Sequence, residues 1–203
     1  MTTELHPDAS AVLSTWFGSD AIVEPIEPAM QRRWFVADPA FDEEIRARFG
    51  ALIDEASGEG LRAWEESARG ALALVLLLDQ FTRNVHRESG RAFVADPVAR
   101  GVAERAIARG FDRAVPFAAR AFFYLPFEHG ETLALQDRSV ALFDALAASA
   151  SPEQAKGARE LCSYAEKHRA VIARFGRFPH RNKALGREST AEEEEFLKAG
   201  RGF

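Results

Sequence analysis

Apolar residues recur every three or four positions along nearly the whole chain, and this spacing restricts the fold more than any other feature. It places them on one face of an α-helix, whereas the period-two alternation of a half-buried β-strand is absent over any useful length. The 203 residues, 47% of them hydrophobic, suffice for one hydrophobic core without a disulfide or metal. The sequence therefore predicts a single all-α domain that spans residues 1–203.

Start and stop signals divide this domain into helices. Asp38-Pro39 and Asp96-Pro97 each place an N-cap aspartate before a proline at the first helical position. Capping boxes are predicted at Ser151–Gln154 and Thr190–Glu193. Pro126 is expected to end one helix and precede the next. The predicted helices cover about residues 8–17, 39–56, 71–84, 97–109, 116–124, 127–148, 152–175 and 191–199, and the stretch around Pro25 and Pro28 is predicted to be a loop.

One heptapeptide occurs twice. Arg33–Pro39 (RWFVADP) recurs as Arg91–Pro97 (RAFVADP), with six of seven residues identical at an offset of 58. Coincidence is one interpretation, because Ala and Arg are abundant and Asp-Pro is a common helix start. Duplication of a helical hairpin, as in stacked-helix repeat proteins, is the other. Similarity fades after the Asp-Pro, so both interpretations stay open.

Charge and cysteine content exclude several classes of protein. The formal charge of −5 disfavours nucleic acid as a partner, because neutralising phosphates requires a basic face. Cys162 is the only cysteine, so no internal disulfide can form and a reducing compartment is expected. The chain starts without a signal-peptide pattern, and its longest apolar run, Ala71–Leu78, is shorter than the roughly 20 residues of a spanning helix. We therefore expect a cytoplasmic protein with neither a nucleic-acid nor a membrane partner.

Four polar residues close the most apolar predicted helix. Asp79 and Arg83 are four residues apart, as are Gln80 and Asn84, so each pair shares a helix face. One hypothesis makes them the wall of a polar ligand pocket. The alternative, which the sequence favours slightly, is an internal salt bridge with an asparagine C-cap that ties helices together.

Histidines and glutamates form a second candidate site. Glu128, His129 and Glu131 follow Pro126 and are predicted near a helix N-terminus, where the helix dipole favours carboxylates. His129 could act there as a base, although capping and structural hydrogen bonds are the stronger interpretation. His168 lies on a predicted apolar stripe, which is more typical of a core histidine than of a site. The sequence contains no strong metal signature, and neither a metal nor a cofactor is expected.

A basic segment forms the third candidate. Residues 174–187 carry a charge of +5 with no acidic residue, and Phe178-Pro179 would stiffen this loop. Grouped arginines suit a carboxylate or phosphate, which they bind in bidentate fashion. Pairing with the acidic run Glu192–Glu195, or with other acidic residues of the protein, is the alternative. The residues predicted to bind a ligand here are Arg174, Arg177, His180, Arg181 and Asn182, with Asp79, Gln80, Arg83 and Asn84 in support.

Several motifs together resemble a known family. They are Leu77–Asn84 (LLDQFTRN), Tyr124–His129 (YLPFEH) and Arg174–Asn182 (RFGRFPHRN), followed by Leu185–Arg187 and Ser189–Glu193. Over nearly its whole length the chain is similar to the DUF924 family, bacterial proteins of unknown function. The resemblance implies a right-handed stack of about eight or nine antiparallel helices, similar to tetratricopeptide-repeat superhelices. It implies no activity, and Gly130 departs from the serine expected after Glu-His.

Two functional hypotheses follow from these sites. The first is a non-catalytic helical-repeat protein that binds a peptide or a small anionic ligand through its Arg- and His-rich segment. Substituting Arg177 and Arg181 with alanine should then abolish binding without changing the thermal midpoint, whereas a large loss of stability would indicate a structural role. The second is a small hydrolase-type enzyme, with His129 or His168 as the base, Glu128 or Glu131 to orient it, and arginines to stabilise developing negative charge.

Overall fold

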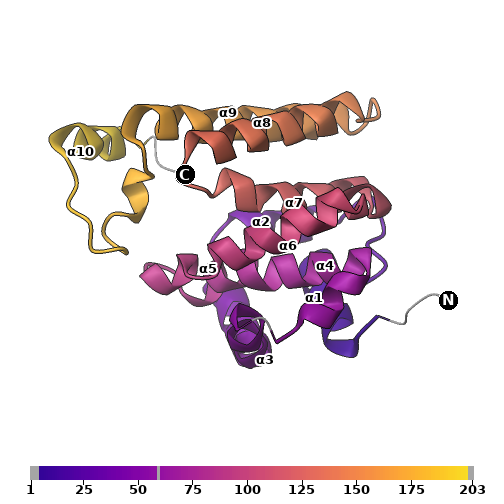
Figure 1. Ribbon diagram of the computed structural model, residues 1–203. Coiled ribbons are helices and arrows are strands. Elements are labelled where there is room, and N and C mark those ends of the chain that lie inside the picture. Colours follow the sequence, from indigo (N-terminus) through magenta and orange to yellow (C-terminus); the bar gives the residue numbers. More distant parts are fainter. Residues whose placement is uncertain (1–4, 59, 201–203) are drawn as a thin grey trace. The chain divides into compact units, whose positions relative to one another are not determined.

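The structure is a computed structural model that describes residues 5–58 and 60–200 (Figure 1). Over these ranges the chain forms helices, turns and loops and no β-strand, so the all-α prediction is confirmed. No helix within the described residues is long and apolar enough to cross a membrane. The right-handed superhelical stack and the cytoplasmic location stay predictions.

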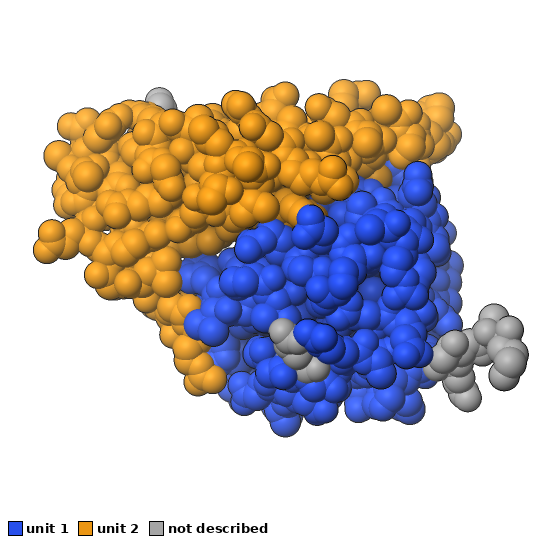
Figure 2. Space-filling model, viewed as in Figure 1, with its two compact units in different colours: residues 1–87, 92–126 blue, residues 88–91, 127–203 orange. Residues whose placement is uncertain are grey.

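The chain divides into two compact units (Figure 2). The N-terminal unit comprises residues 1–87 and 92–126, and the C-terminal unit comprises residues 88–91 and 127–203. The single domain over residues 1–203 stays a prediction. The helices are α1 (Pro7–Phe17), α2 (Pro28–Phe35), α3 (Pro39–Ser57), η1 (Arg62–Glu66), α4 (Ala68–Val75), η2 (Leu76–Phe81), α5 (Thr82–Val85), η3 (Gly90–Phe93), α6 (Asp96–Ala108), η4 (Phe111–Ala114), α7 (Phe117–Glu128), α8 (Leu133–Ala148), α9 (Ala155–Phe175), η5 (Pro179–Arg181) and α10 (Ala191–Lys198).

Aromatic side chains build the core of the N-terminal unit. The Trp16 ring lies 5.6 Å from the ring of Phe81 and 5.7 Å from that of Phe122, measured between centroids. Trp34 stacks on Trp16 and donates a 2.9 Å hydrogen bond from its indole nitrogen to the Trp16 carbonyl. Residues 28–35 form α2, so the prediction of a loop around Pro28 was wrong. Pro28 occupies the first turn of α2, where proline is well tolerated.

The most apolar segment is a continuous helical run through α4, η2 and α5. Residues 71–78 are all buried, as expected of a central helix. Its middle part, η2, is a π-helical turn, in which the wider winding changes the backbone hydrogen-bond pattern. The Thr82 hydroxyl donates 2.8 Å hydrogen bonds to the carbonyls of Leu77 and Leu78, which stabilises this turn.

Helices α8 and α9 lie side by side in the C-terminal unit (Figure 1). The buried face of α9 includes Ala158, Ala165, His168 and Ile172, as its periodicity predicts. The capping box at Thr190 is confirmed. At Ser151, however, the helix begins only at Ala155, although the Gln154 side chain accepts a 3.0 Å hydrogen bond from the Ser151 N–H.

The two copies of the heptapeptide differ in the role of their aspartate. Asp38 caps α3 by accepting hydrogen bonds from the N–H groups of Ala40 and Phe41. Asp96 instead is the first residue of α6, and both of its carboxylate oxygens bind Arg83. Each copy therefore introduces a helix, as predicted, but the same residue caps a helix in one copy and forms an ion pair in the other.

Candidate functional site

The polar residues at the end of the central helix bind one another and the neighbouring helices. The Arg83 guanidinium binds the Asp96 carboxylate in bidentate fashion at 2.9 and 3.0 Å and lies 3.1 Å from Asp79 Oδ1. Gln80 Nε2 donates a 2.5 Å hydrogen bond to Asp79 Oδ2. Burial alone would lower the pKa of Arg83, but the two carboxylates raise it above its usual value. This group therefore links α5 to α6 through an internal salt bridge.

Asn84 makes the corresponding link to α3. Its Nδ2 donates a 2.7 Å hydrogen bond to Asp42 Oδ1, and Arg87 binds the same carboxylate. Asn84 thus ties two helices through a side chain rather than as a C-cap. All four predicted residues of this helix belong to the N-terminal unit, whereas the predicted residues of the basic loop belong to the C-terminal unit.

The segment after Pro126 differs from the prediction. Helix α7 continues through Pro126 to Glu128, and α8 begins only at Leu133 after the N-cap Thr132. Glu128 and His129 therefore lie at a helix C-terminus, not at an N-terminus, so the helix-dipole argument for their charge was wrong. Pro126 removes one backbone N–H from the last turn of α7, yet the helix continues for two residues beyond it.

Two side chains bind the carbonyls at the end of α7 and just after it. Gln136 Nε2 donates 2.7 Å hydrogen bonds to the carbonyls of both Glu128 and Gly130. Arg181 donates a 3.0 Å hydrogen bond to the carbonyl of His129. A cation at this position is favourable, since the C-terminus of a helix carries partial negative charge.

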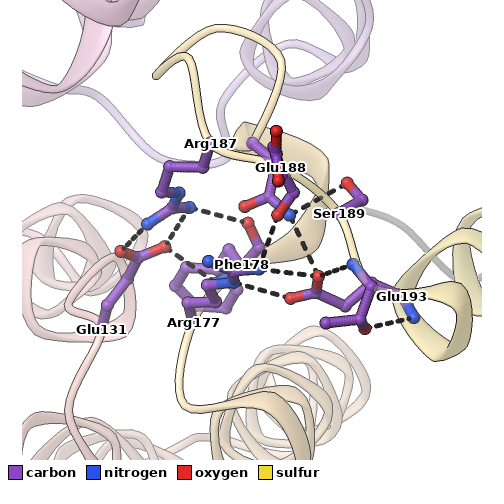
Figure 3. A network of polar contacts seen from close by, with 9 residues as sticks. Glu131, Arg177, Phe178, Arg187, Glu188, Ser189 and Glu193 are labelled. Carbon is purple, nitrogen blue, oxygen red and sulfur yellow. Dashed lines mark hydrogen bonds and ion pairs between the residues drawn. The ribbon is translucent and has the colours of Figure 1, made fainter.

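Glu131 connects the turn between α7 and α8 to the basic loop (Figure 3). Its carboxylate binds the Arg187 guanidinium in bidentate fashion at 2.7 and 3.0 Å and accepts a 2.8 Å hydrogen bond from the backbone N–H of Phe178. Burial alone would raise the pKa of Glu131, but these donors hold it below its usual value. Glu131 is therefore an ionised structural partner rather than an acid positioned to orient His129.

Glu193 fastens the other end of the loop to α10 (Figure 3). Arg177 donates to both of its carboxylate oxygens at 2.7 and 2.8 Å, and the Thr190 N–H and Asn182 Nδ2 bind the same group. The ion pair and these hydrogen bonds lower the pKa of Glu193 to about 2. Arg174 pairs with Glu192 at the surface. Pairing with the acidic run, the alternative to an anion site, thus holds for two of the arginines.

Arg174 and Arg177 should therefore contribute differently to the stability of the fold. Replacing Arg177 with alanine leaves the buried Glu193 carboxylate without its bidentate partner, so we expect the thermal midpoint to fall by several degrees. Arg174→Ala removes an exposed pair and should leave the midpoint almost unchanged. Differential scanning calorimetry of both variants checks this, and equal midpoints would contradict the structural role of Arg177.

His168 is a buried histidine whose pKa is strongly lowered. Its Nδ1 lies 2.9 Å from the Tyr164 carbonyl and 3.3 Å from Glu128 Oε1. A carbonyl can only accept, so Nδ1 carries the proton and Nε2 the lone pair of the neutral ring. Burial lowers the pKa of His168 to about 3, and the nearby basic groups act in the same direction. His168 is therefore neutral at pH 7.

Basic side chains surround the buried ring of Phe178. The His168 ring meets it edge-on at a centroid distance of 5.6 Å, the His180 ring lies 5.6 Å away, and the Arg181 guanidinium lies over it at 4.5 Å. With His129, whose charge also acts on His168, these residues form what we call the basic cluster: His129, His168, His180 and Arg181. The structure thus places together residues from the second and third candidate sites of the sequence analysis.

Several partners were not identified from the sequence. Asp42 and Gln136 are ordinary helix residues in the pattern, and Asp96 was expected only to cap a helix. Only the fold shows which side chain or backbone groups these three residues bind. Arg187 was part of the basic segment but not of the predicted ligand set. No group of three or more His, Cys, Asp or Glu side chains within the described ranges is arranged to hold a metal ion.

Comparison with known proteins identifies the family. The family model for bacterial proteins of unknown function, DUF924, matches residues 12–201. The fold is similar to the solved structure of a protein of unknown function from Agrobacterium tumefaciens, with a TM-score of 0.81 and 39% identity over 95% of this chain and 97% of that one. No curated protein matches the chain. The chain therefore belongs to the DUF924 family.

Proposed function

We propose that the protein binds a small anionic ligand, a carboxylate or phosphate, at the basic cluster of its C-terminal unit. The observation that supports this most is the packing of His168, His180 and Arg181 around Phe178. Helix α9 and the following loop thereby bring three basic side chains to one ring. Arg181 and His180 supply the N–H donors for an anion, and hydrogen bonds from a charged donor such as a guanidinium are strong contacts to anionic oxygen. The single ring N–H of neutral His168 points to the Tyr164 carbonyl, so this residue shapes the site rather than donating to the ligand.

The other arginines of the loop are assigned to structure rather than to the ligand. Arg174, Arg177 and Arg187 each bind a glutamate carboxylate, so their charges are balanced within the C-terminal unit. Arg181 donates a hydrogen bond to the His129 carbonyl and lies over the Phe178 ring, within the basic cluster. The basic cluster is thus the part of the predicted ligand set that we retain.

Electrostatics also favour an anion at the cluster. The pKa of His168 is lowered first by burial and then by the charges of the other cluster members. Groups that oppose protonation of a neighbouring imidazole create a positive local potential, and the same potential attracts an anion. The Glu128 carboxylate beside His168 offsets part of that potential.

Hydrolysis is the second candidate, and the contact between His168 and Glu128 is the observation in its favour. A carboxylate beside a histidine is the arrangement that orients a general base. A base with a pKa of about 3, however, accepts a proton poorly at pH 7, far from the optimum for general-base catalysis. Binding therefore agrees better with the chemistry of His168 than catalysis does.

Calorimetric titration with inorganic phosphate and with citrate tests the proposal. We expect saturable binding to the wild-type protein, and we expect His180→Ala to weaken it by about tenfold or more, because one charge-assisted hydrogen bond is lost. His180 is exposed, so its substitution should leave the thermal midpoint unchanged.

Arg174→Ala is the matched control for this titration. It removes a basic side chain from the same segment, but one that is already paired with Glu192. We expect this variant to bind as the wild type does. Equal affinity of the wild-type protein and His180→Ala would contradict the assignment of the site, and the absence of binding by the wild type to either anion would refute the proposed function.

A further inference from the structure

A second anion-binding feature of the C-terminal unit is already occupied by the protein itself. Figure 3 shows the Glu131 carboxylate held between Arg187 and the backbone of Phe178. We call these donors, the Arg187 guanidinium and the Phe178 N–H, the Arg187 cradle. It uses other hydrogen-bond donors than the basic cluster, although both involve Phe178 and the Arg181 charge acts on both.

The cradle has the geometry of a carboxylate receptor. The two guanidinium nitrogens reach one carboxylate oxygen each, at 2.7 and 3.0 Å, and the backbone N–H adds a third donor at 2.8 Å. This fork-to-fork arrangement with a fixed N–H is how proteins recognise free carboxylates. The Arg181 charge also favours a carboxylate at this position.

The donors are held in place by contacts other than Glu131. Arg187 also donates a 3.1 Å hydrogen bond to the Phe178 carbonyl, and its own N–H donates a 2.8 Å hydrogen bond to the Asn182 carbonyl. Phe178 is fully buried in the core of the C-terminal unit with Val171 and Ile172. The receptor is therefore organised by the loop and its core, while Glu131 reaches it from the turn before α8.

The cradle is also within reach of solvent. The side chains of Glu131 and Arg187 are 26% and 24% exposed, so the ion pair lies at the edge of the core rather than inside it. Rotation of the Glu131 side chain alone would vacate the cradle, with no change in α7 or α8. A free carboxylate must compete with a tethered one, whose effective concentration is in the millimolar range or above.

We propose that the Arg187 cradle is a carboxylate-binding site that Glu131 fills in this structure and that takes an external monocarboxylate when the Glu131 carboxylate is absent. Arg187 and the Phe178 N–H bind the Glu131 carboxylate as a receptor binds its ligand, so a free carboxylate of the same shape fits the same donors. This inference goes beyond the proposed function and does not depend on anion binding at the basic cluster.

Chemical rescue by acetate tests the inference. Glu131→Ala removes one methylene and the carboxylate, which are the heavy atoms of acetate, so acetate should fill the vacated space. We expect acetate, compared with chloride at equal ionic strength, to raise the thermal midpoint of Glu131→Ala by about 2–4 °C at several times its dissociation constant. Adding Arg187→Lys should abolish this shift, because lysine lacks the bidentate fork.

Two controls separate this result from anion binding at the basic cluster. The wild-type protein and Glu192→Ala both retain that cluster, and Glu192→Ala also lacks a surface carboxylate that pairs with an arginine. The measured quantity is the acetate-specific shift of Glu131→Ala in excess of theirs. An equal shift in all three proteins, or none in a folded Glu131→Ala, would overturn the inference. If Glu131→Ala does not fold in chloride, refolding yield in acetate replaces the midpoint, and failure to recover folding refutes the inference equally.

Discussion

Acidification should destabilise the protein by roughly 3 to 5 kcal/mol through His168 alone as the pH falls to about 3. The pKa of this histidine is lowered from 6.5 to about 3 in the folded chain, chiefly by burial. Below pH 6.5 the unfolded chain therefore binds a proton that the folded chain does not bind. The stabilising contribution of neutral His168 is complete above pH 6.5 and is lost progressively on acidification.

Urea unfolding at a series of pH values measures this effect. The interval from pH 6.5 down to 5 separates His168 from Glu131 and Glu193, because the pKa values of both carboxyl groups are lowered from 4.5 and affect stability only at lower pH. Over that interval we expect the wild-type protein to lose about 2 kcal/mol.

A substitution at His168 shows whether that loss belongs to this residue. His168→Gln cannot titrate and should show a nearly flat profile, whereas replacement of the exposed His6 by glutamine controls for the loss of a surface imidazole. Identical slopes for the wild-type protein and His168→Gln would contradict the assignment of a neutral buried imidazole.

Gly70→Ala should destabilise the fold by about 3 kcal/mol. A methyl group on Gly70, in α4, would lie 2.2 Å from the Trp64 carbonyl oxygen and 2.9 Å from Ser67 Oγ. The first of these atoms is backbone and cannot rotate away, and Trp64 itself is buried. Accommodating the methyl group therefore requires η1 to shift against α4 and disturbs the Ser67 cap of that helix.

Gly50→Ala is the matched control for that substitution. Gly50 lies within α3, and a methyl group there meets nothing within 4 Å. Alanine is the better helix former, so we expect this variant to be stabilised by about 0.5–1 kcal/mol. Chemical unfolding of both variants measures the contrast, and similar effects of the two substitutions would show that the tight contact at Gly70 is not what sets its cost.

The sequence predicted those helices well whose signals come from neighbouring residues. The apolar periodicity of residues 71–84 and the caps at Asp38 and Thr190 depend on neighbouring residues and appear in the structure as expected. The sequence predicted a loop where α2 forms, because the stability of this helix comes from the packing of Trp34 on Trp16, which is a tertiary contact. It ended α7 too early because Pro126 is a strong stop signal in the sequence, whereas the helix continues to Glu128, whose carbonyl is bound by Gln136.

The candidate site was predictable in composition but not in pairing. The charge of the segment 174–187 indicated anion chemistry, and the alternative of pairing with Glu192–Glu195 holds for Arg174 and Arg177, whereas the pairing of Arg187 with Glu131 depends on the fold. Only the fold shows which arginines bind glutamates and which one lies over the Phe178 ring. His168 was correctly placed on a buried stripe, but its contact with Glu128 depends on how α7 and α9 meet within the C-terminal unit.

Side-chain nuclear magnetic resonance of the five histidines during a phosphate titration tests the central claim most directly. We predict that the imidazole signals of His129, His168 and His180 shift together along one saturable curve, because a single anion bound at the basic cluster changes the field at all three. The signals of His6 and His86, which belong to the N-terminal unit, should stay in place. If no imidazole signal saturates, or if His6 and His86 respond like the others, the basic cluster is not an anion-binding site.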